Sequence, residues 1–243
     1  MNAKFVRILN EIPGVLLTKT QLNQFEYYYN ELKVWNNKMN LTGSTDQQVI
    51  YFDHFLDSVF PAYAYEGIFS SEINVLDVGT GAGFPGLPIK ILFPKIRICL
   101  LDSIGKRTKF LTHIISSLGL ENVNIVNSRA EAAAHTKIFR EQFDIVLSRA
   151  VAKLQMLSEI TIPFVKLGGT CIFFKGNNPQ AEIIESEGSI SVLGGKISGI
   201  YLKPEDEKFL FRGSLIRVTK QIKTPESFPR KSWNLKNKPL GFE

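Results

Sequence analysis

Residues 75–86 read Val-Leu-Asp-Val-Gly-Thr-Gly-Ala-Gly-Phe-Pro-Gly, and this stretch decides the fold. Its apolar beginning predicts a strand over 74–78, and the apolar spacing after it predicts a helix over 87–93. Between them, glycines at alternate positions allow a tight turn with positive φ and a close approach to a ligand. These glycines are Gly79, Gly81 and Gly83.

An acidic residue follows the turn at the distance that a nucleoside site requires. Asp102 ends the next apolar run, 97–102, and lies 23 residues after Gly79. In nucleotide-binding α/β units, an acid about 20 residues past the glycines accepts hydrogen bonds from the ribose hydroxyls. The spacing therefore predicts an adenosine-containing ligand.

The charge before the turn narrows the choice of ligand. A dinucleotide site uses G-x-G-x-x-G, whereas this chain has G-x-G-x-G preceded by Asp77 at the strand end. A carboxylate there repels a pyrophosphate but attracts an ammonium group. S-adenosylmethionine carries an ammonium, a sulfonium and a ribose without a phosphate, so we expect it as the cofactor. A nicotinamide cofactor and a ligand-free turn are the alternatives.

Strands and helices alternate through the middle of the chain. Such alternation predicts an α/β fold with a mostly parallel sheet covered by helices on both faces. The last two strands have no helix between them and should pair antiparallel. Strands are expected over 74–78, 97–102, 123–127, 143–148, 170–175, 196–202 and 213–220, and helices over 87–93, 106–118, 131–139, 153–165 and 179–187.

The segments before and after this core differ from it in predicted structure and in charge. Residues 1–72 are expected to be a helical N-terminal extension, with an apolar stripe between Leu22 and Met39 and an N-cap at Thr18 or Thr20. The alternating core spans 73–222, and 223–243 form a basic C-terminal tail.

Composition narrows the class of protein. Of the 243 residues, 44% are hydrophobic and 21% charged, which is typical of a globular protein. Apolar runs stay below the roughly 18 residues that span a bilayer, and the N-terminus does not read as a signal peptide. We therefore expect a cytoplasmic, monomeric protein without a membrane partner. Cys99 and Cys171 lie in strand-like runs and should be buried, and three histidines without ligand spacing predict no metal site.

The net charge of +6 is concentrated at one end. Residues 1–72 carry five Lys or Arg against eight acids, whereas 213–243 carry seven against two. A basic end on an enzyme suggests a polyanionic partner, with nucleic acid first, although a solvated tail would have the same composition.

Several motifs together resemble one known family, that of the bacterial small-subunit rRNA methyltransferase G, also known as glucose-inhibited division protein B. The resemblance covers nearly the whole chain. It departs from the family at Ser232-Trp233-Asn234, within a tail whose flanks fit. The matching motifs are Trp35-Asn36 with Asn40-Leu41-Thr42, His54 to Ser58, Val75 to Ile91, Leu100 to Ser103, Lys106-Arg107, Phe110-Leu111, Arg129 to Glu131, Ser148 to Ala152, and Lys175-Gly176.

The resemblance implies a Rossmann-like class I methyltransferase that transfers a methyl group from S-adenosylmethionine to N7 of one guanine in 16S rRNA. The expected partner is 16S rRNA or the small ribosomal subunit; naked RNA and assembled particle both stay open. The expected cofactor-binding residues are Asp77, Gly79, Gly81, Phe84, Asp102, Ser103, Ala130, Glu131 and Arg149.

Guanine N7 is an exposed lone pair, so its methylation needs no general base. Catalysis can then rest mainly on positioning. Arg149 is the expected catalytic residue, because it could contact the methionine carboxylate or orient the guanine or its phosphate, while guanidinium is unsuited to acid chemistry. His54 and Asp57 are left outside the catalytic set. The expected RNA-binding residues are Lys106, Arg107, Lys175, Arg217, Arg230 and Lys231.

Two other functions are compatible with the sequence. The first is methylation of a small molecule or a protein with the same cofactor, which the basic C-terminus disfavours. The second is an RNA-binding assembly factor whose cofactor site is vestigial, which the intact Asp77, glycines and Asp102 disfavour.

Overall fold

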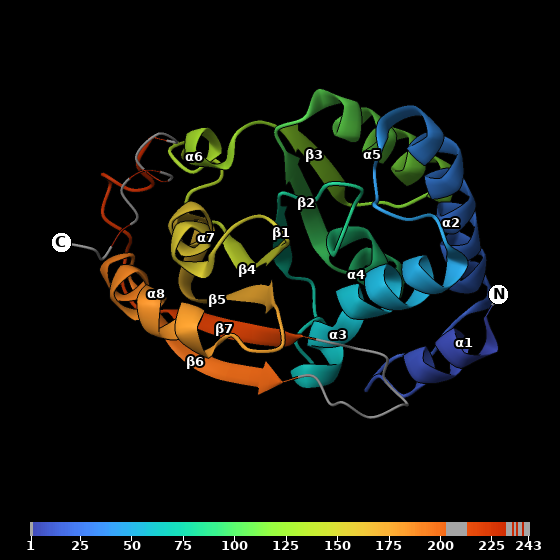
Figure 1. Ribbon diagram of the computed structural model, residues 1–243, viewed down its shortest axis with the longest axis horizontal. Coiled ribbons are helices and arrows are strands. Elements are labelled where there is room, and N and C mark those ends of the chain that lie inside the picture. Colours follow the sequence, from blue (N-terminus) through green and yellow to red (C-terminus); the bar gives the residue numbers. More distant parts are fainter. Residues whose placement is uncertain (1, 203–212, 232–234, 236, 238–239, 241–243) are drawn as a thin grey trace.

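A single twisted sheet of seven strands runs through the protein (Figure 1). The computed structural model describes residues 2–202, 213–231, 235, 237 and 240. The strand order is β3-β2-β1-β4-β5-β7-β6, in which β7 alone runs antiparallel to its neighbours β5 and β6. The strands are β1 (Asn74–Val78), β2 (Arg97–Asp102), β3 (Val123–Asn127), β4 (Phe143–Arg149), β5 (Val165–Lys175), β6 (Gly195–Leu202) and β7 (Ser214–Lys220).

Helices cover both faces of the sheet, as the alternation predicts. One face carries α1 to α5 and the π-helical η1, and the other carries α6, α7 and α8 (Figure 1). The helices are α1 (Ala3–Asn10), α2 (Lys19–Met39), η1 (Val49–Leu56), α3 (Asp57–Ala64), α4 (Gly86–Leu92), α5 (Gly105–Leu118), α6 (Ala130–Ala133), α7 (Leu154–Thr161), the 3-10 helix η2 (Ile162–Phe164) and α8 (Gln180–Val192).

Alternate residues of each strand enter different hydrophobic cores. In β1, Val75 packs with the N-terminal helices while Leu76 faces the layer of α7 and α8. The first core also contains Phe5, Phe25 and other aromatic side chains of α1, α2 and η1. The N-terminal helices therefore share one core with the sheet.

The N-cap predicted at Thr18 or Thr20 is found at Thr18. Thr18 is the N-cap of α2, and its hydroxyl accepts a hydrogen bond from the backbone N–H of Gln21 at 3.2 Å. The side-chain oxygen of Gln21 in turn accepts from the N–H of Thr18 at 2.9 Å, which completes a capping box.

The helix predicted over 131–139 is wrong in its length. Helix α6 ends at Ala133, and the hydroxyl of Thr136 donates to the carbonyl of Ala133 at 2.7 Å. A side chain that bonds a nearby carbonyl offers the backbone an alternative to the helix. The predicted helix over 153–165 is likewise divided, since α7 ends at Thr161 and η2 follows.

Candidate active site

The glycine turn after β1 has the conformation that its sequence predicts. Gly79, Gly81 and Gly83 have φ values of 73°, 60° and 101°, a region that side-chain-bearing residues rarely adopt. A Cβ atom on Gly79 would lie 2.5 Å from Cγ2 of Val151. Glycine is thus required at position 79 because of its positive φ and because the side chain of Val151, in the loop that follows β4, leaves no room for a Cβ atom.

Asp77 is buried beneath this turn and holds it to the following helix. Its Oδ2 accepts hydrogen bonds from the hydroxyl of Thr80 at 2.6 Å and from the N–H of Gly86 at 2.8 Å. Its Oδ1 is buried without a hydrogen-bond partner among the described residues. Burial raises the pKa of Asp77 to about 7. An unsatisfied carboxylate oxygen in this place fits a ligand ammonium group.

Asp102, at the end of β2, faces the turn from the neighbouring strand. Its Oδ2 accepts from the N–H of Gly81 at 2.9 Å and lies 3.4 Å from the guanidinium of Arg107. Its Oδ1 accepts from the N–H of Ile104 at 2.8 Å. These bonds fix the carboxylate at the carboxyl end of the sheet, where ligands of open α/β sheets bind.

A cavity of about 460 Å³ opens over the carboxyl ends of β1, β2 and β3. Five of the predicted cofactor-binding residues line it: Gly79, Asp102, Ser103, Ala130 and Glu131. Arg107, a predicted RNA-binding residue, lines it too. Leu101, Val151, Met156, Ile160 and Leu235 supply much of its apolar wall, and sequence reasoning missed them as site residues.

Arg149, at the end of β4, points toward the N-terminal helices. Its guanidinium donates to the carboxylate of Asp57 at 2.8 Å and to the carbonyl of Asp53 at 3.0 Å, and it lies 3.0 Å from Nδ1 of His54. Burial lowers the pKa of Arg149 to about 10, so the group is still charged at neutral pH. Asp57 and His54, which the sequence analysis leaves outside the catalytic set, thus hold the expected catalytic residue in place.

A second cavity adjoins the first at the loop after β4. It measures about 340 Å³, and Ala150 lines both cavities. Ala150 has a φ of 56°, the left-handed conformation that non-glycine residues adopt at a cost. The polar lining of the second cavity comes from two oppositely charged pairs, Asp57 with Arg149 and Glu182 with Lys175.

Phe84 lies in an aromatic cluster beside this site. Its ring stacks on that of His54 with centroids 4.9 Å apart, and the guanidinium carbon of Arg149 is 5.2 Å from its centroid. The side chain is 6% exposed. Phe84 therefore supports Arg149 and His54, and its predicted contact with the cofactor stays a prediction.

The predicted RNA-binding residues differ in whether their side chains are free to contact RNA. Lys106 and Lys231 are exposed. Lys175 pairs with Glu182 at 2.5 Å, Arg230 pairs with Glu159 at 2.7 Å, and the guanidinium of Arg217 lies over the ring of Tyr65. Internal partners neutralise Lys175 and Arg230, so their placement does not support contact with phosphates. The atypical Ser232-Trp233-Asn234 segment lies outside the described residues.

Within the described ranges, no group of three or more His, Cys, Asp or Glu side chains is arranged to hold a metal ion. None of the helices in the same ranges has the length and hydrophobicity needed to cross a membrane.

Solved structures with the same fold include a methyltransferase of 16S rRNA and a protein with S-adenosyl-L-methionine bound. A variant of the 16S rRNA (adenine(1408)-N(1))-methyltransferase from Catenulisporales acidiphilia matches with a TM-score of 0.52 at 16% identity, over 65% of this chain and 89% of that one. Aeropyrum pernix fibrillarin, solved with S-adenosyl-L-methionine, matches with a TM-score of 0.53 at 14% identity, over 68% of this chain and 74% of that one. At this level of identity the likeness concerns the fold.

The fold is the Rossmann-like fold of methyltransferases, and the family of the chain makes it an enzyme that uses S-adenosylmethionine as methyl donor. Residues 21–209 match the family model described as rRNA small subunit methyltransferase G. The protein of that name from Geobacillus kaustophilus is 43% identical over 99% of this chain and 100% of its own length, and the one from Streptococcus pyogenes serotype M1 is 42% identical over 97% and 98%. The chain belongs to the rRNA small subunit methyltransferase G family.

Proposed function

We propose that this protein transfers the methyl group of S-adenosylmethionine to N7 of a guanine in 16S rRNA of the small ribosomal subunit. Family membership supports the substrate class. The observation that carries the proposal is a pair of adjoining cavities that meet at Ala150. The first cavity has residues expected to bind an adenosine-containing cofactor, and the second has charged side chains.

Residues that line the first cavity, together with Asp77 buried beneath its glycine turn, would hold different parts of the cofactor. Asp102 accepts hydrogen bonds from the ribose hydroxyls, and Ala130 and Glu131 flank the adenine. The unsatisfied Oδ1 of Asp77 attracts the ammonium group. When bound, the cofactor supplies an electrophilic methyl group on its sulfonium sulfur.

The second cavity suits the acceptor base. A guanine has a hydrogen-bond acceptor at O6 and donors at N1 and N2. The cavity is lined by cationic side chains that can donate to O6 and by carboxylates that can accept from N1 and N2. Arg149 lines the second cavity next to Ala150, where it orients the guanine or holds the methionine carboxylate. With the guanine held there, N7 would accept the methyl group from the sulfonium sulfur of the cofactor, and the positive charge would pass from that sulfur to the base.

The charged state of the nearby groups agrees with a reaction that removes no proton. Burial, followed by the neighbouring Arg149, lowers the pKa of His54 to about 4, so the ring is neutral but a poor base at pH 7. The carboxylate of Asp57 is paired with Arg149. Catalysis then depends on alignment of the two ligands rather than on a general base.

Labelled S-adenosylmethionine offered together with total RNA and a protein extract tests this substrate class. We expect label in the small-subunit rRNA. Label in protein or in small molecules alone would favour the other enzymatic function, and failure to bind the cofactor in calorimetry would favour an assembly factor with a vestigial site.

A further inference from the structure

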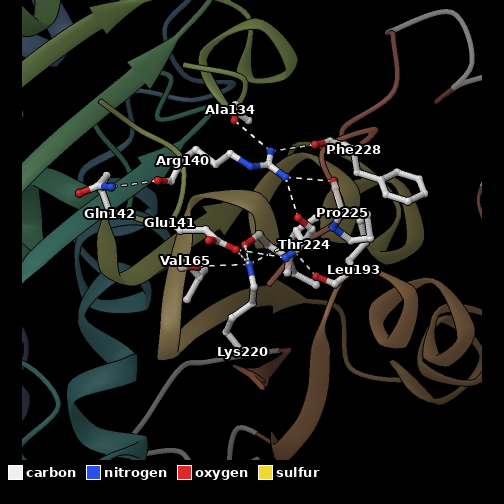
Figure 2. A network of polar contacts seen from close by, with 11 residues as sticks. Ala134, Arg140, Glu141, Gln142, Val165, Leu193, Lys220, Thr224, Pro225 and Phe228 are labelled. Atoms are coloured by element: carbon white, nitrogen blue, oxygen red, sulfur yellow. Dashed lines mark hydrogen bonds and ion pairs between the residues drawn. The ribbon is translucent and has the colours of Figure 1, made fainter. Parts of the chain in front are cut away.

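The basic segment that follows β7 is fastened to the body of the protein. The guanidinium of Arg140 donates to the backbone carbonyls of Thr224 at 2.8 Å, Pro225 at 3.0 Å and Phe228 at 2.8 Å (Figure 2). It also reaches the carbonyl of Ala134 at 3.2 Å. A single side chain from the loop after α6 thus holds three residues of the segment through their main chain.

A second anchor lies where the segment leaves β7. The ammonium of Lys220, itself buried, donates to the hydroxyl of Thr224 at 2.7 Å and lies 3.2 Å from Oε1 of Glu141. The same Glu141 oxygen accepts from the N–H of Thr224 at 3.1 Å, and the Thr224 hydroxyl donates to the carbonyl of Leu193 (Figure 2).

A third anchor reaches helix α7. Glu159 is 1% exposed and accepts from Nε of Arg230 at 2.9 Å and from a terminal guanidinium nitrogen at 2.7 Å. It also accepts from the backbone N–H of Arg230 at 2.8 Å. A buried carboxylate that loses its partner is costly, so this pair holds the backbone of the segment as well as its side chain.

Leu235, four residues after Lys231 in the sequence, lies in the cofactor pocket. Leu235 is 3% exposed and lines the larger cavity beside Met156 and Ile160 of α7. Positions 156, 159 and 160 share one side of a helix. The helix that receives Arg230 therefore also forms the pocket wall next to Leu235.

We propose that a C-terminal strap, defined as residues 224–231 with Leu235, completes the adenine side of the cofactor pocket. Leu235 packs with Met156 and Ile160 against the apolar face of the adenine, opposite the wall of Ala130 and Glu131. Arg140 and Glu159 are positioning residues that set cofactor affinity by holding the strap. This proposal goes beyond the substrate assignment and rests only on S-adenosylmethionine as the cofactor.

The direct test is the affinity for S-adenosylhomocysteine, measured by calorimetry on the full chain. Leu235→Ala should weaken binding about tenfold, since it removes apolar contact worth roughly 1.4 kcal/mol. Leu235→Met should restore most of the affinity. Ile222→Ala, at a position 63% exposed just before the strap, is the matched control and should leave affinity unchanged. An affinity for Leu235→Ala within about twofold of wild type, where tenfold is expected, would overturn the proposal.

Two further readouts separate positioning from stability. If the strap favours ligand binding, ligand binding must in turn favour the bound strap. S-adenosylhomocysteine should therefore slow hydrogen exchange at the amides of Thr224 and Arg230 in the wild-type protein. Exchange at these amides that does not respond to the ligand would contradict a strap linked to the pocket. Glu159→Gln should raise KM for the cofactor and leave kcat at saturating cofactor nearly unchanged, whereas a fall in kcat alone would assign Glu159 another role.

Discussion

The backbone N–H of Gly86 donates a hydrogen bond to Oδ2 of Asp77 over 2.8 Å, which joins the start of α4 to the end of β1. A Cβ atom at position 86 would lie 2.9 Å from this oxygen and 2.5 Å from Cδ2 of Leu100. The glycine permits this close approach, and the hydrogen bond fixes the turn that we propose binds the cofactor.

Gly86→Ala should therefore destabilise the protein by about 1 to 3 kcal/mol, the usual cost of an inserted methyl group in a packed interior. Denaturant unfolding of the purified protein measures this. The control is Gly188→Ala in α8, where a Cβ meets no atom within 4 Å. There the higher helix propensity of alanine should stabilise by about 0.5 to 1 kcal/mol. Equal effects at the two positions would contradict the packing argument.

Cofactor binding should depend on pH through Asp77. With its pKa raised to about 7, Asp77 is protonated below that pH in the free protein, and a ligand ammonium favours the ionised form. Binding at low pH must release this proton, so affinity should fall by up to about tenfold per unit below pH 7 and level off above it.

Asp77→Asn should flatten this dependence, because no proton can be released there. Calorimetry with S-adenosylhomocysteine from about pH 6 to pH 8 compares the two proteins. A pH profile that is the same in wild type and variant would show that Asp77 does not face the ammonium.

Arg149→Lys should impair methyl transfer although it keeps the charge. Lysine cannot reproduce a planar guanidinium that contacts Asp57, His54 and the carbonyl of Asp53 together. A shift of about 1 Å in a positioning group can cost roughly 100-fold, and we expect a loss of that order in kcat/KM. Arg97→Lys, at an exposed ion pair with Glu72, is the conservative control. Unchanged cofactor affinity together with unchanged methylation in Arg149→Lys or Arg149→Ala would remove Arg149 from the site.

Much of the sheet could be predicted because short runs rich in apolar residues alternate with segments of helical spacing along the chain. The strands 74–78, 97–102 and 123–127 have the bounds that the sequence predicts. The carboxyl ends of parallel strands meet at one edge of a sheet. This places Asp77, Asp102, Arg149 and Lys175 at the edge where the two cavities lie.

Contacts between distant segments could not be predicted in this way. His54 and Asp57 meet Arg149 across more than 90 residues, and nothing local marks them as its partners. The charge of the tail predicts an RNA-binding segment. Its fixation by Arg140 depends on backbone carbonyls, which every sequence has, so composition alone gives no sign of it.

RNA affinity should depend on salt through the exposed basic residues rather than the paired ones. Lys106→Gln should reduce the slope of log affinity against log salt by about 0.7 to 0.9, the value for one phosphate contact. Lys95→Gln, at an exposed position before β2 and therefore at the opposite edge of the sheet, should leave the slope unchanged. Arg230→Gln should weaken cofactor binding with little effect on the slope. If Lys106→Gln has the same salt slope as the wild-type protein, the RNA does not contact Lys106.

Methylation of 16S rRNA by this protein is tested most directly by mass mapping of modified guanines in 16S rRNA from cells with and without the protein. We expect one 7-methylguanosine that disappears when the gene is deleted and returns when the wild-type chain is expressed. Small-subunit rRNA with the same 7-methylguanosine content in both strains would contradict it.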